Sequence, residues 1–529
     1  MRPPSRSASV LAPAALLLGG WFSLAPPARA QGRPVFDPAR LHATLGGSAV
    51  LALPGEALLS WGHLDPLPIT VQEPDAETAL PAEDFVRARL RLQPALMLTD
   101  AGWRPFALYQ LAGDVDLLHN LFAVGSGRSP LDYDPAGRTD TGFTGAYVQQ
   151  LYALAAGPNL ALKVGLMRSH WGIGLLANEG EDPDPAADES PFGYANTSDR
   201  VVRVQVAGFP NAARERGAEP PLTLAVAFDG VIDDDTASWS AGDRAYQLLA
   251  AVRGHVGRFT GGFYAVHRWQ RHAEGGETIV TVLDAHARGQ LVHTPSLGVW
   301  LEGEGATILG GSSLPQSAVD PGAFDVASVG GVARFGIQSG IFKGVLEVGF
   351  AAGDDNPFDD KVRDFSFDRE YRVGLLMFRE MMRTSTAVTA LNLADPTWQG
   401  TPPRGFDTVP TGGAVRGASY VNPRVTFTPT PGLALYAGFL YGASDSAYVD
   451  PFRSSLAGGA PVGPNGAVAA DSLGVEVDLG ARYAHRVGQV ELIARAELGW
   501  LDPGGVFDRA AGAHVDNVVG FWLHGGARW

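Results

Sequence analysis

Three arginines, Arg87, Arg89 and Arg91, occupy alternate positions of one short segment. Alternate residues of a β-strand point to the same face, so the three guanidinium groups would lie about 6.6–6.8 Å apart. This spacing is below the Debye length of about 8 Å at physiological ionic strength, so their fields overlap. If this face lines an aqueous passage, the stripe is expected to attract anions.

Other segments carry charged residues of the same parity. The basic ones are Lys163, Arg203, Arg253, Arg334, Arg482 and Arg495, and the acidic ones are Glu347, Glu476, Asp478, Glu491 and Glu497. Two interpretations stay open. Either the basic residues select anions, or acids and bases pair with one another and stiffen a wall. In the second case the stripe would pair with acids such as Glu491 or Glu497, or lie beneath a plug.

Three acidic clusters fall in polar stretches that we predict to be external loops. They comprise Glu179, Glu181, Asp182, Asp184, Asp188 and Glu189; Asp233 to Asp235; and Asp354, Asp355, Asp359 and Asp360. Calcium requires six to eight oxygen ligands, which such loops can supply. None of the clusters has the regular D-x-D-x-D-G spacing, so solvated loops are the preferred interpretation. The last cluster is the calcium candidate.

Catalytic and cofactor motifs are missing from the sequence. It contains no H-E-x-x-H, G-x-S-x-G or P-loop pattern, and its 12 His residues are scattered. The absence of cysteine excludes disulfides and thiolate chemistry. A formal net charge of −16 argues against nucleic acid as a partner. We therefore expect neither an enzyme nor a bound cofactor.

Alternating polarity recurs along most of the chain. Val202, Val204 and Val206 alternate with Arg203 and Gln205, and the same pattern appears in many other segments. We predict eighteen strands near residues 85–98, 103–111, 143–156, 159–169, 201–209, 221–229, 245–257, 260–270, 280–292, 296–306, 330–338, 341–351, 370–380, 415–427, 431–442, 472–485, 489–500 and 518–529. One face of these strands is apolar and the other is charged, as expected for a wet lumen.

The two ends of the chain indicate a compartment and a fold class. Residues 1–30 contain Arg2 and Arg6, an apolar run and Ala28-Arg29-Ala30, which is typical of a secretory signal peptide. The chain closes on an alternating strand with Phe521, Leu523 and Trp529 on one face. Such a closing strand is typical of a bacterial outer-membrane barrel, and we interpret these three residues as its assembly signal.

Only a closed barrel would fit this chain into a membrane. After Gln31 there is no run of the roughly 18–20 apolar residues that a spanning helix needs. Lipid offers no partner for an open strand edge, so spanning strands must close on themselves. Short turns such as 157–159, 338–340, 429–432 and 486–489 separate long polar stretches such as 173–199 and 443–470. Short periplasmic turns and long external loops are the expected arrangement.

Two stretches resemble large porin-like and alginate-export-like outer-membrane barrels. One runs from Gly165 through Arg168 and Trp171 to Gly180, and the other from Phe350 through Gly353-Asp354-Asp355 to Asp368 and Tyr371. The resemblance covers about 60 residues directly and implies an eighteen-stranded channel. It transfers only Arg168 and Asp368, as candidate lumen or loop positions. The terminal Trp departs from the more usual Phe.

We therefore expect an all-β protein: a transmembrane, antiparallel, up-and-down β-barrel of about 18 strands, within a range of 16–20. The expected division is a signal peptide at 1–30, an arm, plug or extra strands at 31–80, and the barrel at 81–529. The segments 44–53 and 57–61 are candidates for extra strands.

The expected function is diffusion or export of hydrophilic solutes, with anionic saccharides as one candidate class. A closed structural or adhesion barrel with partner-binding loops is the alternative. Expected partners are outer-membrane lipid, the barrel-assembly machinery and small hydrophilic solutes, and the oligomeric state stays open.

Overall fold

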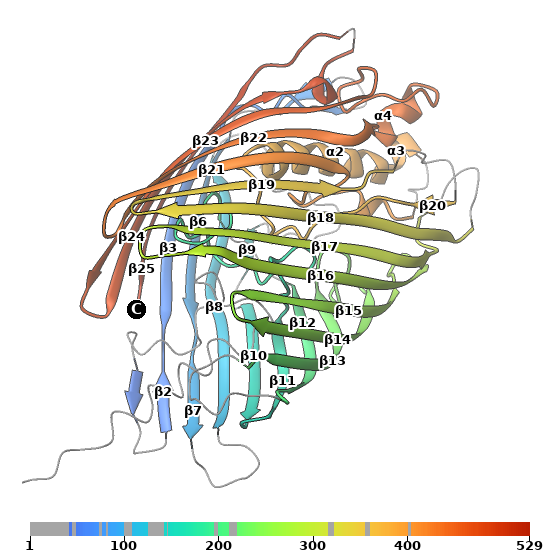
Figure 1. The fold of residues 1–529 in the computed structure, drawn as a ribbon. Coiled ribbons are helices and arrows are strands. Elements are labelled where there is room, and N and C mark those ends of the chain that lie inside the picture. The colour runs from blue at the N-terminus through green and yellow to red at the C-terminus, as the bar shows by residue number, and fades with distance from the viewer. Residues whose placement is uncertain are drawn as a thin grey trace, which may run out of the picture.

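Eighteen antiparallel strands form a closed barrel (Figure 1). The computed structural model describes residues 42–44, 49–72, 77–80, 83–99, 108–124, 142–144, 147–194, 199–210, 220–315, 322–354, 360–399, 404–510 and 512–529. Among these residues, no helix is both long and apolar enough to span a membrane. The predicted signal peptide lies outside the described residues.

The wall strands follow one another around the barrel in chain order. They are β3 (Gly55–Leu64), β6 (Glu83–Leu92), β8 (Leu108–Val124), β10 (Tyr147–Ala156), β11 (Leu160–Arg168), β12 (Arg200–Gly208), β13 (Leu222–Asp233), β14 (Arg244–Val256), β15 (Phe259–Arg271), β16 (Glu277–His293), β17 (Gly298–Ser312), β18 (Phe324–Ser339), β19 (Phe342–Ala351), β21 (Ala418–Thr430), β22 (Leu433–Tyr448), β23 (Ala470–Val487), β24 (Val490–Pro503) and β25 (Val518–Arg528).

The first and last wall strands close the barrel. β3 pairs with β25 from Gly520 opposite Leu64 to Arg528 opposite Glu56. The backbones of Gly55 and the terminal Trp529 exchange two hydrogen bonds of 3.0 Å. β3 contains the candidate segment 57–61 and precedes residue 81, where we expected the barrel to begin.

One predicted strand is wrong. Residues 370–380 form turns and the start of η2 (Met377–Met382), a π-helix that α2 (Arg383–Ala394) continues. The run from Val373 to Phe378 is apolar and buried on all sides. A continuous apolar run does not distinguish a strand from a buried helical segment. The count of eighteen strands therefore holds because β3 takes the place of this segment.

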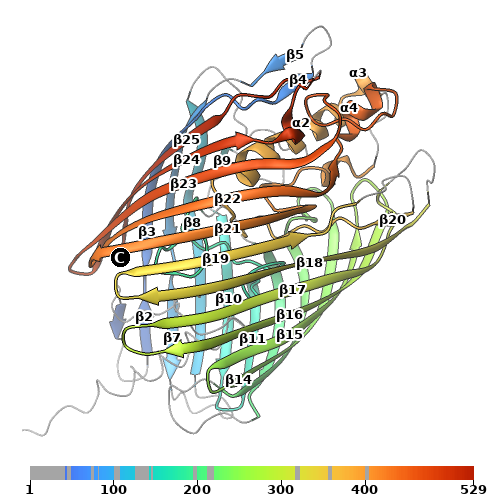
Figure 2. The same ribbon diagram turned by 45° about the horizontal axis from the view of Figure 1, so that its top comes forward.

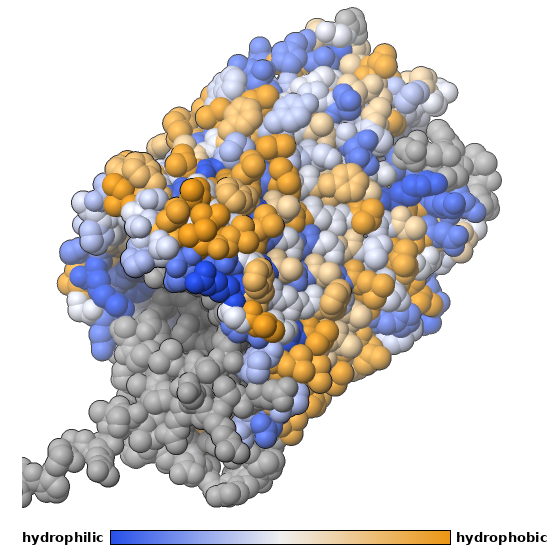
Figure 3. Space-filling view, viewed as in Figure 1, coloured by the Kyte–Doolittle hydropathy of each residue, from blue (hydrophilic) through white to orange (hydrophobic). Residues whose placement is uncertain are grey.

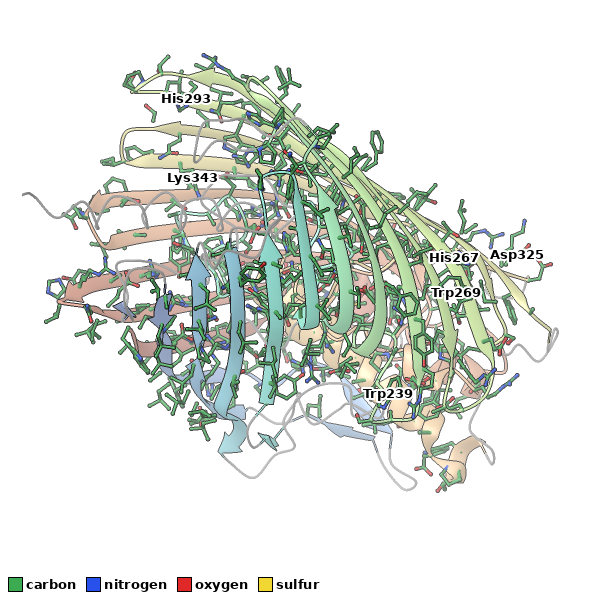
Figure 4. All side chains as sticks on the ribbon, turned by 90° about the horizontal axis from the view of Figure 1, so that it is seen from below. Trp239, His267, Trp269, His293, Asp325 and Lys343 are labelled. Carbon is green, nitrogen blue, oxygen red and sulfur yellow. The ribbon has the colours of Figure 1, made fainter. Side chains whose placement is uncertain are left out.

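The connections differ between the two ends of the barrel. At one end, turns such as 157–159, 257–258, 340–341, 431–432 and 488–489 join neighbouring strands. At the other end, the long connections include 169–199 and 352–417, and they carry the helices, as Figures 1 and 2 show. Figure 4 labels His293 and Lys343 toward the short-turn end and Trp269 and Asp325 toward the long-loop end. This is the asymmetry that the sequence predicted.

Shorter elements complete the fold. β1 (His42–Thr44), β2 (Ala49–Ala52), β7 (Ala95–Thr99), β9 (Gly142–Thr144) and β20 (Lys361–Val362) extend the wall, and β4 (Thr70–Gln72) pairs with β5 (Glu77–Ala79). The remaining helices are α3 (Pro396–Gln399), η3 (Phe406–Thr408), α4 (Pro451–Leu456) and η4 (Gly505–Phe507). α2 lies within the barrel, near the long-loop end (Figures 1 and 2).

Candidate functional site: a constriction inside the barrel

The connection between β11 and β12 enters the barrel, where a wall glutamate holds it. Glu304 on β17 accepts hydrogen bonds from the backbone N–H groups of Ile173 and Leu175. Nearby, the Trp171 Nε1 donates to Asp284 on β16 at 2.9 Å. Buried N–H groups need acceptors, so these carboxylates fix the turn against the wall. We call residues 169–194 the first inserted segment.

The acidic part of this segment lies against basic residues of the wall. We call residues 181–190 the acidic strap. Its carboxylates pair with cations as follows: Asp182 with Arg89 and Arg528, Asp184 with Arg482, and Asp188 with Arg288 and Lys343. We predicted this cluster in a solvated external loop, and that prediction is wrong. The wall cations compensate the carboxylates and draw the loop into the barrel.

Part of the connection between β19 and β21 also enters the barrel, and another wall glutamate holds it. We call residues 363–394 the second inserted segment. Glu476 on β23 accepts hydrogen bonds from three successive backbone N–H groups, those of Leu375, Leu376 and Met377, the last at 2.6 Å. These groups belong to the turn that starts η2, and they have no acceptor within the helix. The carboxylate therefore caps the turn and anchors it to the wall.

The two inserted segments also bind each other. The Asp368 carboxylate accepts a hydrogen bond of 2.8 Å from the backbone N–H of Asn178, and the Asp368 N–H donates to the Leu175 carbonyl at 2.7 Å. Around this junction, apolar side chains of both segments and of the wall form one buried cluster, which includes Phe192, Leu376, Phe378, Tyr420 and Trp522. Asp368 is thus a loop residue inside the barrel that joins the two segments.

Four arginines gather where the segments meet the wall. Tyr194 lies between Arg87 of β6 and Arg379 of η2, whose guanidinium carbons are 4.8 and 5.2 Å from the ring centroid. Arg372 is 9% exposed, and among the described residues its Nε and Nη1 have no hydrogen-bond partner. Arg383 is also buried. We call Arg87, Arg372, Arg379 and Arg383 the arginine cluster.

Two acids, Glu370 and Glu380, lie near this cluster. The Arg372 Nη1 lies 3.7 Å from Glu370, longer than a hydrogen bond. Burial raises the pKa of Glu380 to about 7, although Arg383 and Arg379 act in the opposite direction. Glu380 is therefore partly protonated near neutral pH, and in that state it compensates less of the positive charge of Arg379 and Arg383 in a buried, low-dielectric place.

The arginine stripe predicted from the sequence faces the interior, but acids compensate two of its members. Arg89 pairs with Glu56 and Asp182. Arg91 lies 2.6 Å from Asp116 and 3.4 Å from Asp114. The partners are therefore not Glu491 or Glu497, the acids that we had suggested.

The other predicted lumen residues also lie on the inner face, mostly in ion pairs. The pairs are Arg168 with Asp114, Arg203 with Asp229, Arg334 with Glu347, Arg482 with Asp184 and Arg495 with Glu497. Lys163 lies 4.0 Å from the Tyr152 ring centroid. Asp478 is buried beside Glu476, while Arg253 and Glu491 are half-buried. Whether any of them sets selectivity stays a prediction.

The outer face of the wall has the composition that lipid requires. Along β12, Val202, Val204 and Val206 are exposed on one face, while Val201 and Arg203 are buried on the other. Figure 3 shows apolar residues across much of the visible wall. Exposed aromatic residues mark two levels: Phe259, Phe342 and Tyr483 near the short turns, and Trp269, Tyr441 and Trp500 toward the other end. An apolar band between two aromatic girdles is characteristic of outer-membrane barrels.

The closed wall, its apolar outer face and the two aromatic levels are the features of an outer-membrane β-barrel. No family model and no curated protein matches it. Among solved structures it is similar to Pseudomonas aeruginosa OpdQ, with 9% identity over 90% of this chain and 98% of that chain and a TM-score of 0.45. It is also similar to Pseudomonas aeruginosa OccK11 (OpdR), with 11% identity over 90% and 95% and a TM-score of 0.43.

A third similar structure is Pseudomonas aeruginosa OccK2 (OpdF) in complex with glucuronate. It has 10% identity over 90% of this chain and 97% of that chain and a TM-score of 0.43. Similarity at this level shows the fold alone.

The remaining candidates are the possible calcium ligands and the predicted assembly signal. Within the described part of the chain, no group of three or more His, Cys, Asp or Glu residues could hold a metal ion. Asp354 binds Arg363, Asp360 is exposed, and Asp355 and Asp359 are outside the described residues. Of the predicted assembly signal, Phe521 and Leu523 lie on the outer face, and the backbone of Trp529 is hydrogen-bonded to that of Gly55 in β3. Their role in assembly stays a prediction.

Sequence reasoning missed several of the residues that hold the inserted segments against the wall. Glu304 was not singled out, although it shares an inner face with Glu302. Asp114 and Asp116 alternate in the same way as the arginines that they bind, so alternation could have found them. Arg379 and Arg383 have i, i+4 spacing, which indicates one helical face, but we had assigned their neighbourhood to a strand.

Proposed function

We propose that this barrel is a channel through which small hydrophilic solutes cross the outer membrane, and that it prefers anions. The arginine cluster carries the proposal, because it places buried guanidinium groups at the junction of both inserted segments. Arg372 has two N–H groups without a protein acceptor in the described residues. A guanidinium binds a carboxylate or phosphate through two parallel hydrogen bonds, so such a group would satisfy these donors.

Anionic saccharides are one class that fits this proposal. Their carboxylates would bind the guanidinium groups, and hydroxyl groups could exchange hydrogen bonds with the charged inner wall. Tyr194 adds an aromatic ring, but Arg87 and Arg379 already lie against it. The support is therefore stronger for negative charge than for a sugar ring.

Reversal potentials in planar bilayers under a salt gradient test the preference for anions. The wild-type barrel should pass anions more readily than cations. The double variant Arg372→Gln/Arg379→Gln should have a lower anion-to-cation permeability ratio, most clearly at low salt. Arg271→Gln is the matched control, because Arg271 is 76% exposed on the outer rim and pairs with Glu277. Equal anion-to-cation permeability ratios in all three proteins would show that the arginine cluster does not select ions.

A closed barrel that serves as a scaffold is the second candidate. The observation that favours it is the apolar cluster inside the barrel, in which residues 371–390 are buried throughout. Such packing supports a rigid plug as well as a narrow constriction. A closed scaffold would give no conductance steps in a bilayer, whereas a channel would.

A further inference from the structure

The acidic strap crosses between distant parts of the wall. Its carboxylates pair with cations of five strands: Arg89 from β6, Arg528 from β25, Arg482 from β23, Arg288 from β16 and Lys343 from β19. β6 and β25 both neighbour β3, whereas β16 and β19 lie elsewhere around the barrel. Lys343 is the second residue of β19, close to a short turn. The strap therefore reaches from the long-loop end toward the opposite end.

Cationic side chains supply the polar contacts that hold the strap against the wall. In the described polar contacts between residues 182–188 and the wall, every partner is an Arg or Lys side chain, including Arg424 on the Asp188 carbonyl at 3.2 Å and Lys343 on the Ala187 carbonyl. Pro183 and Pro185 have no N–H to donate. By contrast, residues 173–178 are held through backbone N–H groups by Glu304 and Asp368. The polar contacts of residues 182–188 are therefore distinct from those of that anchor.

Two glycines flank the strap at positions suited to hinges. Gly180 has φ of 64° and Gly193 has φ of 81°, a left-handed conformation that glycine adopts without a steric penalty. Hinge movements occur at a few loop residues that absorb large backbone changes. Ala186, between the hinges, is exposed, so the strap already borders solvent.

We propose that the acidic strap is an autoinhibitory contact that anions displace. Its carboxylates form ion pairs with the wall cations Arg482, Arg288 and Lys343. An anionic solute could bind these cations if the strap were displaced. A solute that binds these cations only when the strap has left shifts the population toward the open form. Salt has the same effect, because the Debye length falls to about 3 Å at 1 M. The inference rests on the proposed channel function.

Cysteine labelling tests the movement of the strap without relying on conduction. The chain has no native cysteine. Ala187 is 8% exposed in the strap, and Ala177 is 7% exposed in the anchored part of the same segment. A small thiol reagent should label Ala187→Cys faster as sodium chloride or sodium citrate is added. Ala177→Cys should stay protected. An electrophoretic mobility shift on heating confirms that each barrel is folded.

Charge removal should have the same effect as salt. Asp184→Asn/Asp188→Asn keeps the side-chain sizes but removes the ion pairs. Loss of these pairs should shift the strap equilibrium roughly tenfold toward the displaced form. The labelling rate of Ala187→Cys should rise accordingly in this background at low salt. Asp395→Asn is the matched control, because Asp395 lies in the connection between α2 and α3, outside the strap.

Conductance then separates this inference from the channel proposal. At low salt the Asp184→Asn/Asp188→Asn channel should conduct more than the wild type, and the two should converge at high salt. If salt, citrate and charge removal all leave the labelling rate of Ala187→Cys unchanged, the strap proposal is wrong, even if the channel conducts. Faster labelling of Ala187→Cys without any conductance would support a displaceable strap but contradict the proposed channel function.

Discussion

Glu380 is the residue through which pH should act on the arginine cluster. Its pKa of about 7 places its titration near neutrality. Below this pKa the carboxyl group is neutral and no longer offsets the charge of Arg379 and Arg383. Above it the carboxylate offsets part of their charge. The preference for anions should therefore be greater at low pH than at high pH.

Reversal potentials measured about one pH unit on either side of that pKa check this prediction. The wild-type anion-to-cation permeability ratio should fall as pH rises through the interval. Glu380→Gln should hold the ratio near its low-pH value throughout. A wild-type ratio that does not change with pH, or that rises, would mean that Glu380 does not face the passage.

The identity of the lumen-facing residues was predictable, but their partners were not. Alternation places Arg89, Arg91 and Glu476 on the inner face, where the structure has them buried. Arg89, however, binds Asp182, which is 93 residues away, and Arg528 binds the same carboxylate across 346 residues. Strand periodicity says which face a residue occupies. It carries no information about which distant loop will contact that face.

At the scale of the wall strand, β23 allows a matched test of the lipid-facing side. Leu479 lies midway along the strand and is 49% exposed, whereas Tyr483 is exposed on the same face nearer the short turn. An arginine facing lipid costs about 2–4 kcal/mol at the midplane and about 0–1 kcal/mol near an interface. Leu479→Arg should therefore destabilise the barrel more than Tyr483→Arg.

Urea unfolding of the two variants in lipid vesicles measures this difference. Arg482→Gln, on the inner face of the same strand, should unfold close to wild type, since its ion pair with Asp184 is long and partly exposed. Equal stability of Leu479→Arg and Tyr483→Arg would show that this face does not contact the bilayer core.

The turn before η2 should depend on a single wall carboxylate. Glu476→Ala would leave the N–H groups of Leu375, Leu376 and Met377 without acceptors, at a cost of about 1–3 kcal/mol for each buried group. Hydrogen exchange of these amides should then become much faster, while the wall strands keep their protection. Glu476→Gln keeps an accepting oxygen and should have a smaller effect. If these three amides stay protected from hydrogen exchange in Glu476→Ala, other contacts hold the turn.

Regular wall strands were the most predictable elements, and inserted segments the least. From β10 to β19, each predicted range overlaps an observed strand, because each strand has one apolar face and one polar face, although β17 and β18 extend beyond the predicted ranges at the long-loop end. Residues 373–378 form an uninterrupted apolar run, and the acidic strap has no large apolar residue. Neither alternates apolar with polar residues in the way a wall strand does. The apolar run was therefore taken for part of a strand, and the acidic strap for an external loop.

At the scale of the whole molecule, the orientation in the membrane can be tested by labelling intact cells. Asn159 lies in a short turn and Thr397 in α3 at the long-loop end, and both are exposed. Short turns are expected to face the periplasm. An impermeant thiol reagent should therefore label Thr397→Cys and spare Asn159→Cys. The reverse labelling pattern would show that the long-loop end, which carries the helices, faces the periplasm.

If the barrel is a channel, it must conduct despite its two inserted segments. Single-channel recording of the purified wild-type protein in a planar bilayer measures this. We expect discrete conductance steps, with a reversal potential under a salt gradient that has the sign for anions. Folded, heat-modifiable protein that inserts into the bilayer without any conductance step, at low or high salt, would instead be a closed scaffold.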